Sequence, residues 1–158
     1  MNVSEYIANY LERKKIKNIF LLTGGGMMYL TDALYKSKIN LIFNHNEQAS
    51  FFATDGLARV SESCQVSFVT SGPGLTNIVT GVLSAWQDSI PIVIIGGQCK
   101  STETIQFSKI KNLRQNGTFE ANGTEILKPI TKFSAQVNNP NLINYYLDKA
   151  FFIANHGR

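Results

Sequence analysis

The hydrophobic positions of the chain change spacing several times along the first 35 residues. Apolar side chains recur every three or four positions at first, which predicts a helix that ends near Arg13. A short continuous apolar run follows at residues 18–23 and is closed by three glycines at 24–26, a pattern typical of a strand buried on both faces. A second helix is expected over residues 27–35.

The same succession of strand, turn and helix repeats along the chain. Further strands are expected at residues 40–43, 66–69 and 91–95, with helices at 47–60 and from the turn at 72–74 to Trp86. A fifth strand is expected at about 132–137, and Pro140 then opens a last helix. Strands that alternate with helices predict an α/β fold of three layers, α/β/α, with a central parallel sheet that binds ligands at the carboxyl ends of its strands.

Residues 100–123 are polar and lack a clear period, so they are expected to form a long loop with one or two short helical turns. No linker or low-complexity segment interrupts the chain. We therefore expect one domain over residues 1–158.

Composition narrows the classes of function. The formal net charge is +4, but the basic run at residues 13–15 falls at the end of the first helix, where cations complement the helix dipole, so no nucleic-acid partner is expected. The two cysteines, Cys64 and Cys99, form no metal-binding motif and are expected to be reduced thiols. No stretch is apolar and long enough to span a membrane, and no signal peptide is evident. A soluble, cytoplasmic protein without membrane contact is therefore expected.

Three segments at the ends of predicted strands could carry chemistry. The glycines at 24–26 allow a ligand to approach the backbone, although a tight strand-to-helix turn explains them equally well. Glu47 follows the second strand; it is either a surface charge favoured by the helix dipole or a carboxylate held in a cleft for acid–base chemistry. The segment 70–77, Thr-Ser-Gly-Pro-Gly-Leu-Thr-Asn, is a compact turn that can present backbone amides to a ligand.

Taken together, these segments resemble the N-terminal, pyrimidine-binding domain of thiamine-diphosphate-dependent enzymes of the acetolactate synthase type. In that family a Gly-Gly turn, a His-Glu-Gln segment and a Ser-Gly-Pro-Gly-x-x-Asn segment follow the first, second and third strands. The order and spacing match here, and the likeness extends to Asp55–Arg59, Asp88–Pro91 and Lys128–Lys132, so it covers essentially the whole chain.

The resemblance implies roles for individual residues. Glu47 would be the glutamate that activates the cofactor through a hydrogen bond to N1′ of its aminopyrimidine ring. The pyrimidine side of the cofactor would lie against Thr23, Gly24 and Gly25. Three further residues would shape the pocket around Glu47, namely Ser71, Pro73 and Asn77.

The sequence also departs from the family. Asn46 stands where the family commonly has His, although His45 is adjacent. Phe119 stands where acetolactate synthases tend to have a substrate-side Gln, which favours related enzymes of surface-polysaccharide pathways that use other acceptors. The family's Gly-Asp-Gly motif with a downstream Asn, which binds Mg²⁺ and the diphosphate in another domain, is not found in these 158 residues, so no metal ligand is predicted.

The resemblance thus implies a lyase or transferase that decarboxylates a 2-oxo acid and joins the product to a carbonyl acceptor. Its active site would be shared between the subunits of a homodimer or larger assembly, and the sequence does not decide whether FAD accompanies the thiamine diphosphate. The chain is expected to be truncated and inactive alone. Two alternatives stay open: a natural small subunit of a split 2-oxo acid decarboxylase, and a flavodoxin-like or dinucleotide-binding module.

Overall fold

The protein folds around a four-stranded parallel sheet in the strand order β2-β1-β3-β4. The structure, a computed structural model, describes residues 1–157. The strands are β1 (Asn18–Leu21), β2 (Asn40–Phe43), β3 (Gln65–Val69) and β4 (Ile92–Gly96). In register, Asn18 lies beside Asn40 in β2, Leu21 lies beside Phe68 in β3, and Val69 lies beside Gly96 in β4.

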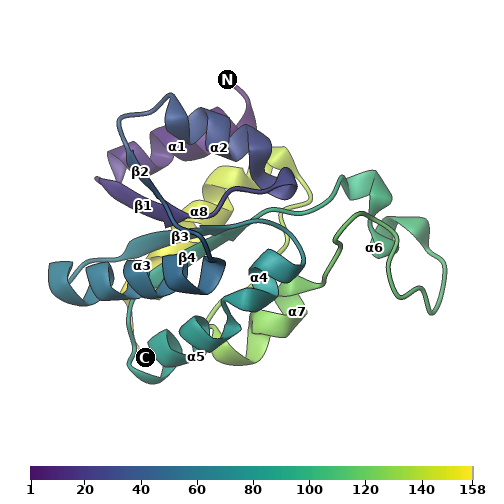
Figure 1. The fold of residues 1–158 in the computed structure, drawn as a ribbon. Coiled ribbons are helices and arrows are strands. Elements are labelled where there is room, and N and C mark those ends of the chain that lie inside the picture. Colours follow the sequence, from purple (N-terminus) through teal and green to yellow (C-terminus); the bar gives the residue numbers. More distant parts are fainter. Residues whose placement is uncertain (158) are drawn as a thin grey trace.

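Helices cover both faces of this sheet (Figure 1). The principal helices are α1 (Val3–Arg13), α2 (Met28–Tyr35), α3 (Glu47–Ser61), α4 (Pro73–Asn77), α5 (Val79–Gln87), α6 (Ile105–Ser108), α7 (Gly123–Leu127) and α8 (Ile143–Asn155). Short 3-10 turns complete the elements: η1 (Gly25–Met27), η2 (Ser101–Glu103), η3 (Lys128–Ile130) and η4 (Pro140–Leu142).

Two hydrophobic cores lie on opposite faces of the sheet. Alternate strand residues such as Leu21 and Phe68 pack on one face against α1, α2 and α8. On the other face Val69 packs against Phe51 of α3 and Val82 of α5. Successive strand side chains point to opposite faces, so strands that are apolar throughout need cover on both sides. The predicted three-layer α/β/α fold with a parallel sheet is confirmed.

Several helix boundaries follow from local capping. The Asn2 side chain accepts from the Glu5 N–H and the Glu5 carboxylate accepts from the Asn2 N–H, which closes a capping box at the start of α1. The Asn46 side chain accepts from the Ala49 N–H at 3.1 Å and begins α3. The helix predicted from the turn at 72–74 to Trp86 is interrupted at Ile78, where α4 gives way to α5.

Residues 98–122 form an arm that extends away from the sheet and carries η2 and α6 (Figure 1). The expectation of a long loop with short helical turns is confirmed. The arm is closed at its base by the Gln98 side chain, whose amide donates to the Ala121 carbonyl oxygen at 2.9 Å.

The predicted fifth strand at 132–137 is wrong, because this segment has no strand beside it among the described residues. Its side chains instead pack on neighbouring helices. Phe133 stacks on Tyr146 of α8 at 6.4 Å between ring centroids, and the Ser134 hydroxyl donates to the Thr124 carbonyl oxygen at 2.9 Å. A strand requires a hydrogen-bonded neighbour as well as an apolar pattern. Within residues 1–157 no helix is both long enough and apolar enough to cross a membrane.

Candidate active site

The turns that follow β1 and β3 meet the start of α3 at the carboxyl ends of the strands. The strand order places β1 between β2 and β3. The three glycines follow β1, Glu47 follows β2 after a short connection, and the Gly72-Pro73-Gly74 turn follows β3. The parallel sheet therefore brings together the three segments that the sequence singled out.

Glu47 is the first residue of α3 and is partly buried. Its Oε2 accepts a hydrogen bond of 2.8 Å from Nδ2 of Asn77, the last residue of α4. Its Oε1 accepts none from the residues that the structure describes. A β-carbon added at Gly74 would lie 3.2 Å from Oε1, so the backbone closely approaches the carboxylate there. One oxygen of Glu47 is thus fixed, and the other is available to a ligand.

Thr70 lies between the glycine turn and the turn after β3. Its Oγ1 accepts a hydrogen bond of 3.2 Å from the Gly26 N–H. A β-carbon would lie 2.5 Å from this Oγ1 if added at Gly24, and 2.5 Å from the Thr70 methyl group if added at Gly74. Thr70 therefore requires glycine on both sides. From the sequence alone, Thr70 belonged to the segment 70–77 but had no predicted role in the site; its position directly after a buried strand was the available signal.

The other predicted cofactor-binding residues divide into two groups. Gly24 and Ser71 lie in the cluster: Ser71 is buried, and its Oγ would be 2.7 Å from a β-carbon at Gly26. Gly25 is open, because no atom lies within 4 Å of a β-carbon added there. The side chains of Thr23 and Pro73 are exposed, and Thr23 Oγ1 lies 3.4 Å from the hydroxyl of Thr31 in α2. The structure thus brings Gly24, Ser71, Glu47 and Asn77 together but turns the Thr23 side chain toward α2.

Phe119 lies where the arm meets the site. It has a φ of +54° and a side chain that is 63% exposed, and its carbonyl group contacts the position of a β-carbon at Gly72, which has a φ of +58°. The adjacent Glu120 carboxylate holds the arm together. Partial burial acts to raise the pKa of Glu120, but hydrogen bonds from the N–H groups of Ile105, Gly117 and Asn116 outweigh it, so this pKa is lowered.

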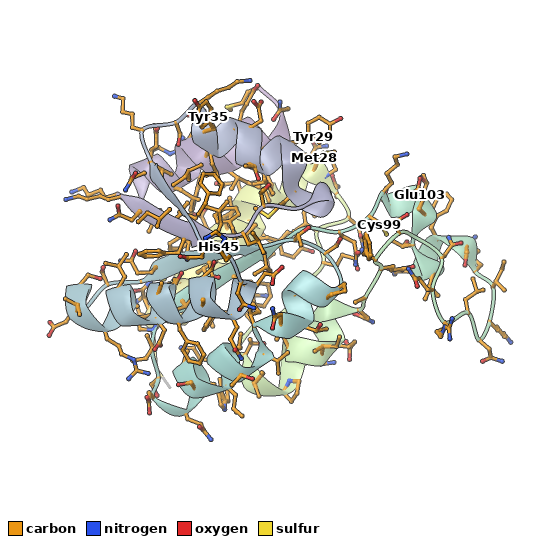
Figure 2. The ribbon with its side chains drawn as sticks, in the orientation of Figure 1. Met28, Tyr29, Tyr35, His45, Cys99 and Glu103 are labelled. Atoms are coloured by element: carbon orange, nitrogen blue, oxygen red, sulfur yellow. The ribbon has the colours of Figure 1, made fainter. Side chains whose placement is uncertain are left out.

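Neither histidine builds a metal centre. His45 is exposed just after β2 (Figure 2), whereas His156 stacks on Phe152 at the end of α8 with ring centroids 4.1 Å apart. The described residues contain no group of three or more His, Cys, Asp or Glu side chains that could hold a metal ion.

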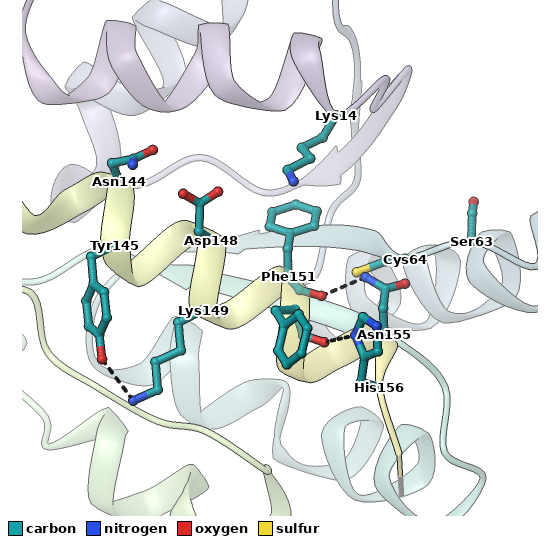
Figure 3. Close-up of a pocket in the computed structure, with 11 residues that line it drawn as sticks. Lys14, Ser63, Cys64, Asn144, Tyr145, Asp148, Lys149, Phe151, Asn155 and His156 are labelled. Carbon is teal, nitrogen blue, oxygen red and sulfur yellow. Dashed lines mark hydrogen bonds between the residues drawn. The ribbon is translucent and has the colours of Figure 1, made fainter.

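A separate open hollow of about 940 Å³ lies between the end of α1, the residues that precede β3, and α8 (Figure 3). It includes Cys64 but none of the site residues described above. Burial raises the pKa of the Cys64 thiol to about 11, so this thiol is largely protonated at neutral pH and is a poor nucleophile. Both cysteines are free thiols, as predicted.

This α/β domain, with a glycine-lined glutamate at the carboxyl edge of a parallel sheet, matches a known family over most of its length. Residues 1–122 match the family described as thiamine pyrophosphate enzyme, N-terminal TPP binding domain, and the chain belongs to that family.

Its curated relatives include acetolactate synthases. The chain is 37% identical over its whole length to the probable acetolactate synthase large subunit of Methanocaldococcus jannaschii. It is 34% identical to the isozyme 3 large subunit of Escherichia coli over 98% of the chain, and 32% identical to the chloroplastic enzyme of Arabidopsis thaliana, also over 98%. These matches cover 25%, 26% and 22% of the respective relatives. The chain therefore spans about a quarter of their length.

Proposed function

We propose that Glu47 is the cofactor-activating carboxylate of a thiamine-diphosphate-dependent enzyme similar to acetolactate synthase. One observation carries this proposal: Asn77 holds Oε2 of Glu47 at 2.8 Å, while Oε1 has no partner within residues 1–157 and faces a glycine-lined turn. A surface glutamate at a helix start has no need of such a holder. A carboxylate that exchanges a proton with a ring nitrogen must place an oxygen within hydrogen-bond reach of that nitrogen, and Oε1 is the oxygen that stays available.

The residues around Glu47 fit the pyrimidine end of the cofactor. No atom lies within 4 Å of a β-carbon added at Gly25, so the backbone N–H and C=O groups there are open to close approach by a flat ring. Two residues pack against the glycine turn: Ser71 is buried, and the Thr70 hydroxyl accepts a hydrogen bond from the Gly26 N–H. Thiamine diphosphate, when bound, supplies the electron sink for decarboxylation of a 2-oxo acid. Glu47 would hold and transfer the proton at N1′ of the aminopyrimidine ring.

The rest of the active site would come from elsewhere in the assembly. The described residues hold no cluster of metal ligands, so Mg²⁺ and the diphosphate would be bound by a part of the enzyme beyond this region. Met28 and Tyr29 lie on α2 directly after the glycine turn and are 62% and 79% exposed (Figure 2). Large exposed apolar side chains beside a half-open site favour a subunit contact that closes it. We therefore favour a homodimer or larger assembly.

The acceptor substrate would be sensed near Phe119. This aromatic side chain stands at the junction of the arm and the Gly72 turn, where it can offer apolar contact and no hydrogen bond. We propose a carbonyl acceptor other than that of acetolactate synthesis, such as a sugar-derived carbonyl compound. Phe119→Gln in the full-length enzyme should shift the ratio of kcat/KM values between a sugar carbonyl acceptor and pyruvate toward pyruvate.

The test of the catalytic assignment is Glu47→Gln in the full-length enzyme. We expect exchange of the thiazolium C2 proton of bound cofactor, followed by NMR, to slow at least about 100-fold, because the amide cannot supply the proton. Glu125→Gln is the matched control, since Glu125 is exposed in α7 and pairs only with Lys128. Unchanged C2 exchange in the Glu47 variant, with cofactor bound, would overturn the assignment.

A further inference from the structure

Helix α4 contacts both α3, which begins with Glu47, and α7, which directly follows the arm (Figure 1). Two of its five residues make these contacts. Asn77 donates to Oε2 of Glu47 at 2.8 Å, whereas the Leu75 side chain packs against Gly123 at the start of α7. Residues two positions apart on a helix point about 200° away from each other. One side of α4 therefore holds the carboxylate, and the other side faces the arm.

The Leu75 side chain lies between two glycine backbones. A β-carbon added at Gly123 would lie 2.5 Å from Cδ1 of Leu75, and one added at Gly96 would lie 3.1 Å from the same atom. Gly96 ends β4 just before the arm begins, and Gly123 is the first residue after the arm. Leu75 thus packs at both ends of the arm, where the chain leaves the sheet and where it returns.

The turn that precedes α4 contacts the arm as well. The Phe119 carbonyl group occupies the space beside Gly72, where a side chain would otherwise stand. The Gly72 carbonyl oxygen in turn accepts a hydrogen bond of 3.1 Å from the Thr76 N–H, which ties the turn to the helix. The arm therefore contacts α4 and its leading turn at two separate places, Gly72 and Leu75.

The position of α4 depends on these contacts. A helix of five residues forms few internal hydrogen bonds, so what it packs against decides where it lies. Leu75 is partly buried and packs against the core cluster that contains Val69 and Ile78. A hydrogen bond weakens steeply when its length or angle changes, so a small movement of α4 is sufficient to release Glu47 from Asn77.

We propose that Leu75 is a positioning residue that couples the arm to Glu47. When the arm is packed as observed, Leu75 holds α4 in place and Asn77 then fixes the Glu47 carboxylate. When the arm loosens, α4 moves and the carboxylate is no longer held. Leu75 acts through Asn77 and not on the reacting atoms. The proposal rests on the proposed role of Glu47 and adds to it a control by the arm that carries Phe119.

The first experiment measures exchange of the thiazolium C2 proton of bound thiamine diphosphate in the full-length enzyme. We expect Leu75→Ala to slow this exchange about tenfold, because the hydrogen bond to the Glu47 carboxylate is made less often. Leu75→Met keeps the apolar volume and should exchange within about twofold of the unmodified enzyme. Ile92→Ala is the control for lost packing alone, since Ile92 packs against the same core but begins β4, at the edge of the sheet opposite the site.

The arm itself supplies a readout that needs neither cofactor nor activity. Trypsin cleavage within residues 98–122 should be several-fold faster in Leu75→Ala than in Ile92→Ala, because only Leu75 packs at the ends of the arm. Equal effects of the two variants on both C2 exchange and cleavage would show that Leu75 is an ordinary core residue and would overturn the proposal.

A second pair of variants tests the contact between Leu75 and Gly123 directly. Gly123→Ala overlaps Cδ1 of Leu75 and should also slow C2 exchange about tenfold. Leu75→Ala removes the overlapping atoms, so the double variant should exchange no more slowly than Leu75→Ala alone. Effects that multiply in the double variant would mean that the two residues act independently, and the coupling would be wrong.

Failure of the coupling and failure of the proposed function give different results. Normal C2 exchange in Glu47→Gln would overturn the proposed function together with the coupling that rests on it. Slow exchange in Glu47→Gln with normal exchange in both Leu75→Ala and Gly123→Ala would overturn the coupling alone.

Discussion

Asn77 donates from Nδ2 to Oε2 of Glu47 across 2.8 Å, although the two residues are 30 positions apart and lie on different helices. Glu47 begins α3 and Asn77 ends α4. The contact fixes the plane of the carboxylate and leaves Oε1 directed to the glycine-lined turn. It therefore acts on the group that we propose to be catalytic without contacting the reacting atoms, and Asn77 is a positioning residue.

Asn77→Ala is expected to lower kcat of the full-length enzyme about 10- to 100-fold, since a hydrogen bond to a charged group contributes about 1.5–3 kcal/mol. The dissociation constant of thiamine diphosphate should change much less. Steady-state kinetics and cofactor titration measure the two effects. Thr76→Ala is the control, because that hydroxyl bonds only to the Pro73 carbonyl oxygen on the same exposed turn. Equal kcat in both variants would exclude a positioning role for Asn77.

Gly74→Ala tests the packing around Thr70. The new β-carbon would lie 2.5 Å from the Thr70 methyl group and 3.2 Å from Oε1 of Glu47. Relief of this overlap should cost about 1–3 kcal/mol of unfolding free energy and should also displace the carboxylate. Urea unfolding of the full-length protein, together with kcat, measures both effects.

Two companion variants make this prediction specific. Gly56→Ala enters open space in the middle of α3 and should stabilise the protein by about 0.5–1 kcal/mol. Adding Thr70→Ser to Gly74→Ala removes the overlapping methyl group while keeping the hydroxyl that accepts from Gly26, so it should recover part of the lost stability. A Gly74→Ala protein as stable and active as the unmodified one would refute this account of the turn.

The sequence predicted correctly those features that depend on the local pattern of apolar residues and on local turn chemistry. Short apolar runs located all four strands, three of them closed by glycine, and a carboxylate after β2 pointed to Glu47. The sequence pattern gave a wrong or incomplete prediction where the local structure depends on which other segment packs beside it. The apolar run at 132–137 resembles a strand but has no strand beside it. The role of Thr70 arises only when three glycines, two of them more than 40 residues away, are brought against it.

Glu120 is predicted to control the order of the arm at residues 98–122. Its carboxylate accepts from the Ile105 N–H at 2.7 Å and from the N–H groups of Asn116 and Gly117 at 3.1 Å each. The pKa of Glu120 lies below its usual value of 4.5, because these three donors outweigh the effect of burial. A lowered pKa in the folded state means that the stabilisation is complete above pH 4.5 and is lost as the pH falls through the folded-state pKa.

The rate of limited proteolysis by trypsin reports how ordered the arm is, because Lys109, Lys111 and Arg114 are exposed cleavage sites within it. Glu120→Gln should make cleavage at pH 7.5 several-fold faster, since an uncharged amide accepts these hydrogen bonds more weakly than a carboxylate. Glu103→Gln is the control within the same arm, because Glu103 makes only an exposed ion pair with Lys100. In the unmodified protein, amide exchange at Ile105 and Gly117, corrected for intrinsic rates, should lose protection below pH 4.5. Cleavage at equal rates in both variants would show that the arm is ordered by other contacts.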